Sequence, residues 1–315
     1  MINELKKVEI GGIKQSILVK GQNNENPILL ILHGGPGFPL MPFSNKLKRL
    51  EDEFIVVYWD QRGAGKSYSE EILSNTMTIE RFLKDTYEVI QLVKCEYGKE
   101  RIFLAGHSWG SILGINLAHK YPSEIYAYIG ISQVVDFVKG SEISYQFALK
   151  TAKERNMTDK VEKLIEIGEP HLRGGIAAVS LVSSYVSEFG GAFHIPVDVE
   201  DIMGDSEVYS TIDIDNINKG MQFSAVNLIE AMVETNLVKA KKLTFEIPII
   251  LLCGKYDYTV PSEVVLEYYE ILTAPSKEVI WLNESAHFCY LEETENFIDI
   301  LFRIKKANYS IPDSV

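Results

Sequence analysis

Short apolar segments alternate with helical patterns along most of this chain, and this alternation constrains the fold more than any other feature. Apolar runs bounded by glycine or polar clusters predict buried strands over residues 27–32, 54–59, 101–105, 126–132, 248–253 and 278–282. Apolar residues spaced three and four apart predict helices over residues 79–93, 109–121, 262–272 and 293–305. Strands joined through helices by short links form a parallel sheet covered on both faces. The sequence therefore predicts an α/β fold: a mostly parallel central sheet flanked by helices, with an opening hairpin over residues 8–19.

One long segment interrupts the alternation. Residues 133–243 carry mostly helical patterns and no convincing strand, and the alternation resumes at residue 248. A chain of 315 residues is long enough for one large core with an insertion. We therefore expect an α/β core domain formed by residues 1–132 and 244–315, with residues 133–243 inserted as a helical cap.

Composition excludes several classes of protein. The formal net charge of −13 argues against a nucleic-acid partner, whose phosphates require a basic surface. No apolar stretch approaches the roughly 18 residues of a membrane span, and residues 1–12 lack the apolar centre of a signal peptide. Cys95, Cys253 and Cys289 cannot all pair with one another, and no CxxC spacing occurs. These features predict a reduced, cytoplasmic protein with no membrane partner, and they leave the oligomeric state open.

The negative charge is concentrated in the predicted cap. Residues 186–238 hold ten acidic side chains against a single base, Lys219. Runs of charge commonly form a solvated surface that keeps a protein soluble. A second interpretation is a surface that attracts a cationic substrate, and the sequence leaves both open.

The sequence GHSWG at residues 106–110 fits the GxSxG pattern of a nucleophilic serine, between a predicted strand and a predicted helix. The serine of such a turn has a strained backbone, and side chains two positions away would collide with the strand and the helix. Glycine removes that collision. Because the turn places Ser108 at a helix N-terminus, backbone N–H groups there can stabilise developing negative charge. We expect Ser108 to be a nucleophile.

A serine nucleophile needs a base, and His287 is the histidine that follows the last predicted strand. The order Ser, Asp or Glu, His along the chain places the base there. Asp257 is the carboxylate in the loop after the strand at residues 248–253, where the acid that orients the histidine is expected. The sequence thus predicts a catalytic triad of Ser108, Asp257 and His287.

A third loop, HGGPG at residues 33–37, directly follows the strand at residues 27–32. Acyl transfer requires two N–H donors that bind the oxyanion, one from the residue after the nucleophile and one from such a loop. We assign these donors to the backbone N–H groups of Trp109 and Gly35.

Two other chemistries are excluded. The sequence GAGKS at residues 63–67 resembles a phosphate-binding loop, but Asp60 stands where that motif requires glycine. No pair of histidines has the spacing of metal ligands, so a zinc hydrolase is not expected. We therefore expect no metal.

Three motifs taken together, HGGPG at residues 33–37, WDQRGAGKS at 59–67 and GHSWGS at 106–111, resemble those of the proline iminopeptidase family of α/β-hydrolases. The triad loops extend this likeness over the predicted core. The resemblance implies the α/β-hydrolase fold with eight strands, a helical lid, no cofactor, and removal of an N-terminal residue that is often proline. It also supports Gly35 and Trp109 as oxyanion donors, and implies that Asp60 and Arg62 brace the loops.

The predicted cap departs from the family pattern. Proline iminopeptidases carry a WxxWE motif there, whose glutamate helps to bind the substrate amino group, whereas all three tryptophans of this chain lie outside residues 133–243. Another family glutamate corresponds at best to Glu230 or Glu234, which lie four residues apart on a predicted helix over residues 221–238. Such a pair could hold a substrate ammonium group or face water.

Three functions remain open at this point. The first is a prolyl aminopeptidase-like serine hydrolase acting on short peptides, with acids of the cap holding the α-ammonium group. The second is an ester or lactone hydrolase, including one for amine-bearing macrolide-type lactones, with an apolar cap pocket formed by Phe137, Tyr145, Phe147 and Phe223. The third is a non-catalytic binding protein on the same fold, which the complete set of catalytic motifs disfavours.

Overall fold

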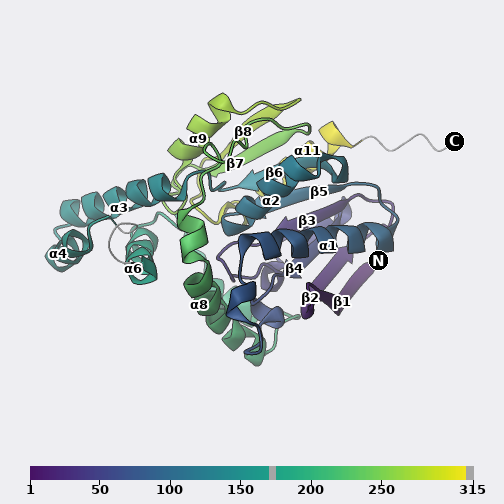
Figure 1. Ribbon diagram of the computed structural model, residues 1–315, viewed down its shortest axis with the longest axis horizontal. Helices are drawn as coiled ribbons and strands as arrows, with labels where there is room; N and C mark the ends of the chain where they lie inside the picture. The colour runs from purple at the N-terminus through teal and green to yellow at the C-terminus, as the bar shows by residue number, and fades with distance from the viewer. Residues whose placement is uncertain (170–174, 310–315) are drawn as a thin grey trace.

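The computed structural model describes residues 1–169 and 175–309, and within them one sheet of eight strands forms the centre of the molecule (Figure 1). The strand order is β1-β2-β4-β3-β5-β6-β7-β8. Strand β2 pairs antiparallel with β1 and β4, and all other pairs are parallel. The strands are β1 (Ile2–Ile10), β2 (Ile13–Gly21), β3 (Ile28–Leu32), β4 (Ile55–Asp60), β5 (Ile102–His107), β6 (Ile125–Ile131), β7 (Ile249–Gly254) and β8 (Lys277–Leu282). The predicted α/β class and the eight strands implied by the family resemblance are confirmed.

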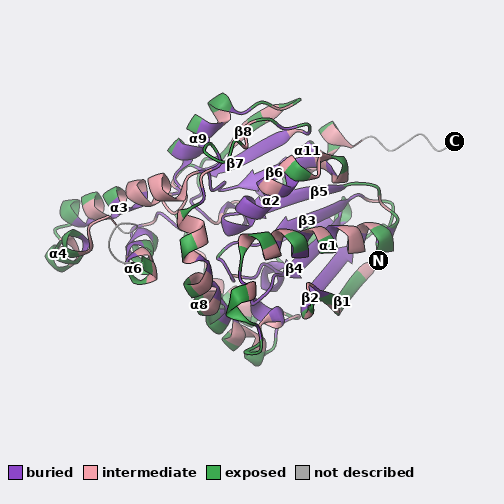
Figure 2. Ribbon diagram, in the orientation of Figure 1, coloured by how far each residue is buried: buried purple, intermediate pink, exposed green. Residues whose placement is uncertain are grey.

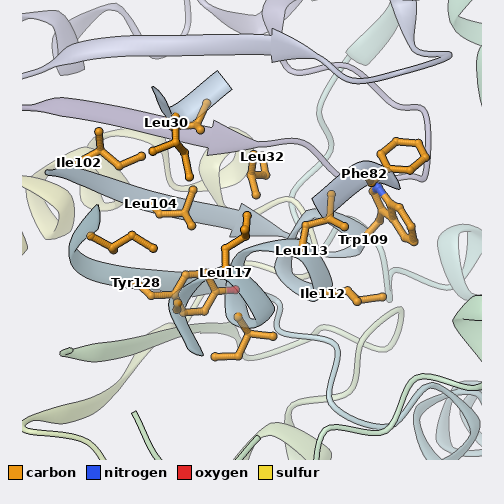
Figure 3. Close-up of a cluster of buried hydrophobic side chains, with 14 of the residues drawn as sticks. Leu30, Leu32, Phe82, Ile102, Leu104, Trp109, Ile112, Leu113, Leu117 and Tyr128 are labelled. Atoms are coloured by element: carbon orange, nitrogen blue, oxygen red, sulfur yellow. The ribbon is translucent and has the colours of Figure 1, made fainter. Parts of the chain in front are cut away.

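Helices cover both faces of this sheet. On one face α1 and α2 pack against β3, beside Leu30, Leu32 and Leu104 (Figure 3), and α9 packs against β7 and β8. Leu29 and Ile31 point to the other face, where α11 packs. The core helices are α1 (Ile79–Tyr97), α2 (Trp109–Lys120), α9 (Ser262–Ile271), α10 (Cys289–Glu292) and α11 (Thr294–Asn308), with 3₁₀ turns at Met41–Phe43, Lys48–Asp52, Gly65–Ser67, Ser74–Thr76 and Pro122–Glu124. Burial on both faces explains why these strands are continuous apolar runs (Figure 2).

The described residues between β6 and β7 form helices and contain no strand. These helices are α3 (Phe137–Glu154), α4 (Thr158–Ile167), α6 (Gly175–Glu188), α7 (Val199–Gly204) and α8 (Thr211–Val233). α3, α4 and α6 share a small apolar cluster of their own, and α3 and α4 extend away from the sheet (Figure 1). The domain boundaries drawn at residues 132 and 244 stay a prediction, and residues 170–174 and 310–315 of those ranges lie outside the described residues.

One helix prediction was wrong in its limits. The predicted helix over residues 221–238 begins ten residues earlier, because Ser210 and Asp213 form a reciprocal capping box at the start of α8. The first turns of α8 are largely polar, so the apolar pattern did not include them. Within residues 1–169 and 175–309, no helix combines the length and the apolar character needed to cross a membrane.

Helix α8 lies directly against two core loops at Gly220. A Cβ atom at Gly220 would lie 2.3 Å from the carbonyl oxygen of Gly63, in the loop after β4. Conversely, a Cβ atom at Gly37, in the loop after β3, would lie 2.8 Å from the carbonyl oxygen of Gly220. Backbone therefore meets backbone at this contact, which leaves no room for a side chain.

This contact predicts that the usual effect of a helical glycine-to-alanine change is reversed at position 220. Alanine in a helix interior normally stabilises by roughly 0.5–1 kcal/mol. At Gly220, overpacking against Gly63 should instead lower the free energy of unfolding by about 1–3 kcal/mol. Gly204→Ala is the matched control, because a Cβ atom at Gly204 meets nothing within 4 Å. Denaturant unfolding of both variants measures the difference, and a Gly220→Ala protein as stable as Gly204→Ala would contradict the prediction.

Candidate active site

Ser108 lies at the sharp turn between β5 and α2, with backbone angles φ 51° and ψ −118°. A positive φ is unfavourable for serine, so the surroundings must hold this conformation. The Ser108 amide donates a hydrogen bond of 3.0 Å to the carbonyl oxygen of Ile131 on β6. A Cβ atom at Gly106 would lie 2.5 Å from the Gly110 carbonyl oxygen, and one at Gly110 would lie 2.3 Å from that of Leu32. Both glycines of the GxSxG pattern are thus required by close backbone packing.

Asp257 and His287 meet although thirty residues separate them. The Nδ1 atom of His287 lies 2.9 Å from Oδ2 of Asp257, and both side chains are buried. Because an ionised carboxylate only accepts, Nδ1 carries the proton and Nε2 is the basic nitrogen. The other carboxylate oxygen, Oδ1, accepts hydrogen bonds from the amides of Thr259 (2.9 Å) and Val260 (2.8 Å). The turn after β7 therefore fixes the carboxylate, and the carboxylate fixes the tautomer of the histidine.

Ser108 and His287 line one cavity of about 750 Å³, which lies between the core loops and the inserted helices. Gly35 lines the same cavity. Most of the other lining side chains are apolar and come from the inserted helices and the core loops, among them Phe137, Ile176, Val179, Phe193, Met203, Met221, Ile229, Met232, Val260 and Phe288. The structure thus places two predicted triad residues and one predicted oxyanion residue around a single, mainly apolar space.

The two predicted oxyanion donors are free to act through their backbones. Gly35 has φ 112°, a conformation that favours glycine. The Trp109 side chain is fully buried: its indole N–H donates to Gln61 (3.0 Å), and its ring packs edge-on against Phe82 (Figure 3). Among the described residues, neither the Gly35 nor the Trp109 backbone N–H has a hydrogen-bond partner. Their predicted role stays a prediction.

Two further histidines, His33 and His107, connect the loops of the site through hydrogen bonds. His33 Nε2 accepts from the Gln61 amide (3.1 Å), while Nδ1 donates to the Gly34 carbonyl oxygen (2.9 Å). Burial lowers the pKa of His33 to about 4, so this ring is neutral near pH 7. His107 Nε2 donates to the carbonyl oxygen of His287 (3.0 Å), and burial lowers the pKa of His107 well below its ordinary value. Both rings act as neutral connectors between loops.

Asp60 and Arg62, which the family resemblance assigns to loop bracing, are both buried. The Arg62 guanidinium donates to Asp85 (2.8 Å) and to the Gly11 carbonyl oxygen (2.8 Å). Asp60 accepts from the Lys66 amide (2.8 Å) and from the hydroxyl of Tyr209, which lies between α7 and α8. Burial raises the pKa of Asp60 to about 7. Arg62 therefore joins core elements, and Asp60 joins the core to the inserted helices.

The two predicted substrate-binding acids do not line the cavity. Glu230 lies on the solvent face of α8, and Glu234, just after the helix, is also exposed. Helix α8 has two inward faces. The face packed on the core consists of Ile217, Gly220, Ser224 and Leu228. The face that lines the cavity consists of Asn218, Met221, Ala225, Ile229 and Met232. The role predicted for Glu230 and Glu234 stays a prediction.

Among the described residues, the acids that line the cavity are Asp136 and Glu200. Both oxygens of Asp136 are engaged, one by the Lys139 amide (3.1 Å) and one by the side chain of Asn236 (2.5 Å). Glu200 is in the first turn of α7, and its carboxylate has no hydrogen bond or ion pair among the described residues. Glu200 belongs to the acidic stretch at residues 186–238, but no local motif in the sequence indicates that it lines the cavity.

Of the four aromatic residues expected to form an apolar pocket, only Phe137 lines the cavity. The Tyr145 hydroxyl donates to Leu164 within the cluster formed by α3, α4 and α6. Phe147 stacks on Tyr258 with ring centroids 3.8 Å apart, and Phe223 packs edge-on against Tyr68 of the core. These rings join helices to one another or to the core, so the expectation was wrong for three of the four.

Comparison with known proteins identifies the family of this chain. A family model described as serine aminopeptidase, S33, matches residues 28–294. A probable aminopeptidase of Bacillus subtilis is 33% identical over 95% of each chain, and a proline iminopeptidase of Heyndrickxia coagulans is 24% identical over 93% of this chain and 96% of its own.

Solved structures share the fold at lower identity. The proline iminopeptidase of Mycobacterium smegmatis superposes with a TM-score of 0.72 at 17% identity, over 97% of this chain and 98% of that chain. An esterase from Exiguobacterium antarcticum superposes with a TM-score of 0.63 at 18% identity, over 97% of this chain and 100% of the esterase. The predicted α/β-hydrolase fold is confirmed. The family match over residues 28–294 and the 33% identity over nearly the whole chain mean that this protein belongs to the S33 serine aminopeptidase family of α/β hydrolases.

Proposed function

We propose that this protein is a serine aminopeptidase that removes N-terminal residues from short peptides through an acyl-enzyme on Ser108. The observation that carries the proposal is the hydrogen bond that holds His287 on Asp257, with His287 and Ser108 lining one cavity. Membership of the S33 family and the aminopeptidase names of its relatives support the peptide substrate.

In the proposed reaction the Ser108 hydroxyl attacks the carbonyl carbon of the first peptide bond while His287 Nε2 takes its proton. Asp257 stabilises the imidazolium that forms, and the N–H groups of Gly35 and Trp109 bind the oxyanion. The tetrahedral intermediate collapses when His287 returns the proton to the leaving amine, which leaves the acyl group on Ser108. A water molecule, deprotonated by His287, then releases the acyl group and restores the serine.

An aminopeptidase must also bind the α-ammonium group of its substrate, and we assign this role to Glu200. Glu200 lines the cavity with no partner among the described residues, whereas both oxygens of Asp136 are already engaged. An ammonium group that enters the cavity would therefore find a free carboxylate on α7.

Ser108→Ala should lower kcat for the best substrate by roughly 10⁴–10⁶. The substrates to assay are prolyl and alanyl anilides beside short-chain aryl esters and lactones, with wild type and variant measured in parallel. Ser187→Ala is the matched control, since Ser187 lines the same cavity on α6 and its loss should change kcat less than about twofold. A Ser108→Ala protein with near-normal turnover would refute the proposed mechanism.

Ester or lactone hydrolysis is the second candidate, and the cavity itself favours it. A volume of about 750 Å³ with mainly apolar walls is of the size that holds drug-sized ligands, well beyond the needs of one proline residue. A bulky neutral ester would use the same triad and would need no carboxylate partner. Turnover of esters or lactones without any turnover of anilides would favour this candidate over the aminopeptidase.

Glu200→Gln separates the two candidates. If Glu200 holds an ammonium group, the variant should raise KM for anilides about threefold to tenfold and leave KM for aryl esters unchanged, because an exposed ion pair contributes about 1 kcal/mol. Glu230→Gln and Glu234→Gln serve as controls of equal charge change outside the cavity lining. An increase in KM for either control, with none for Glu200→Gln, would return the ammonium site to the acids indicated by the sequence.

A further inference from the structure

A short segment after α6 crosses between the two loops that carry Asp257 and His287. We refer to residues 191–195 as the bridging segment. The Gly191 carbonyl oxygen accepts a hydrogen bond of 2.9 Å from the Tyr258 amide, one residue after Asp257. The Ala192 carbonyl oxygen accepts one of 3.0 Å from the amide of His287 itself. The bridging segment thus contacts both triad loops through backbone atoms.

Glu292, on α10, completes this connection from the core side. Its Oε1 atom accepts hydrogen bonds from the amides of His194 (2.6 Å) and Ile195 (2.9 Å) in the bridging segment. Its Oε2 atom accepts one from the amide of Ala286 (2.9 Å), the residue directly before His287. One carboxylate therefore joins the bridging segment to the histidine loop through three backbone donors.

Packing holds the bridging segment at the same place. The ring of His194 stacks on Tyr256 at 3.5 Å, and the ring of Phe193 stacks on Phe288 at 4.5 Å. Gly191 has no room for a side chain, because a Cβ atom there would lie 2.8 Å from Cβ of Tyr258. The segment is therefore set between residues adjacent to both Asp257 and His287.

An ionised carboxylate suits all three donors best. It offers acceptors at both oxygens, and hydrogen bonds to an ionised acceptor are roughly twice as strong as neutral ones. Burial raises the pKa of Glu292, and the three backbone donors act in the opposite direction. A glutamine amide has a single acceptor oxygen, so its NH₂ group would face either Ala286 or the two amides of the bridging segment.

We propose that Glu292 is a positioning residue that holds His287 in place by tying its loop to the bridging segment. The inference rests on the proposed role of His287 as the base. It extends that proposal by making the bridging segment, which joins α6 to α7, part of the support of the triad. A base that is displaced by about 1 Å can lower a catalysed rate by about 10²-fold.

Glu292→Gln tests this inference. We expect kcat for the best substrate to fall about tenfold to a hundredfold with KM changed less than twofold. The His287 Nδ1–H proton bonded to Asp257 should shift in the proton NMR spectrum of the folded variant, which a role in stability alone would not cause. An unchanged kcat and an unchanged proton resonance would overturn the inference.

Two neighbouring glutamates provide matched controls. Glu293 accepts hydrogen bonds from the Glu284 amide (3.0 Å) and the Ser285 hydroxyl, so it holds the histidine loop without contacting the bridging segment. Glu295 is exposed and pairs with Arg49. We expect Glu295→Gln to match wild type and Glu293→Gln to lose less activity than Glu292→Gln. Equal losses in Glu292→Gln and Glu293→Gln would overturn the role of the bridging segment.

Two more variants distinguish a failure of the positioning role from a failure of the proposed function. If Glu292→Gln does not fold, Ile195→Pro deletes one donor from the exposed end of the bridging segment and should also lower kcat with little change in KM. A wild-type kcat for folded Ile195→Pro would then overturn the inference. Ser108→Ala runs in the same assay. If Ser108→Ala is inactive and Glu292→Gln is fully active, only the positioning role is refuted. If Ser108→Ala retains its activity, the proposed function is refuted.

Discussion

The parallel strands β3 to β7 are covered on both faces, and this constraint determines where chemistry can occur in the molecule. Buried strands leave little place for polar side chains within the sheet, so reactive groups collect in the loops at the carboxyl ends of the strands. The loops after β3, β5, β7 and β8 carry Gly35, Ser108, Asp257 and His287 respectively. Residues far apart in the chain thus reach one edge of one sheet.

The inserted helices are attached to this edge at several independent points. Backbone packs on backbone where α8 meets the loops after β3 and β4, and Asp60 accepts a hydrogen bond from Tyr209. The bridging segment meets the loops after β7 and β8. Three of the four loops proposed to take part in the chemistry thus contact the insertion directly. The insertion therefore closes the cavity and also forms part of its frame.

The sequence predicted most of the core and its candidate site because the relevant signals are local. GHSWG sets a strained turn by itself, and the positions of Asp257 and His287 follow from the order of the strands. The direction in which Glu230 points was not predictable, because α8 packs on two sides and its apolar residues do not mark a single face. Glu292 was also missed, since its partners are backbone amides, which carry no signal in the sequence. An acidic residue close behind the histidine loop was the only available indication.

Helix α8 divides attachment to the core and lining of the cavity between separate faces of one rigid element. Gly220 and Ser224 meet the core, whereas Met221 and Ala225, each one position further along the chain, line the cavity. The cavity face can therefore diverge among relatives without loosening the helix from the core. A hydrolase built in this way can change the shape of its cavity by substitutions along a single stripe, while the loops that carry Ser108, Asp257 and His287, and the contacts that hold them, stay unchanged.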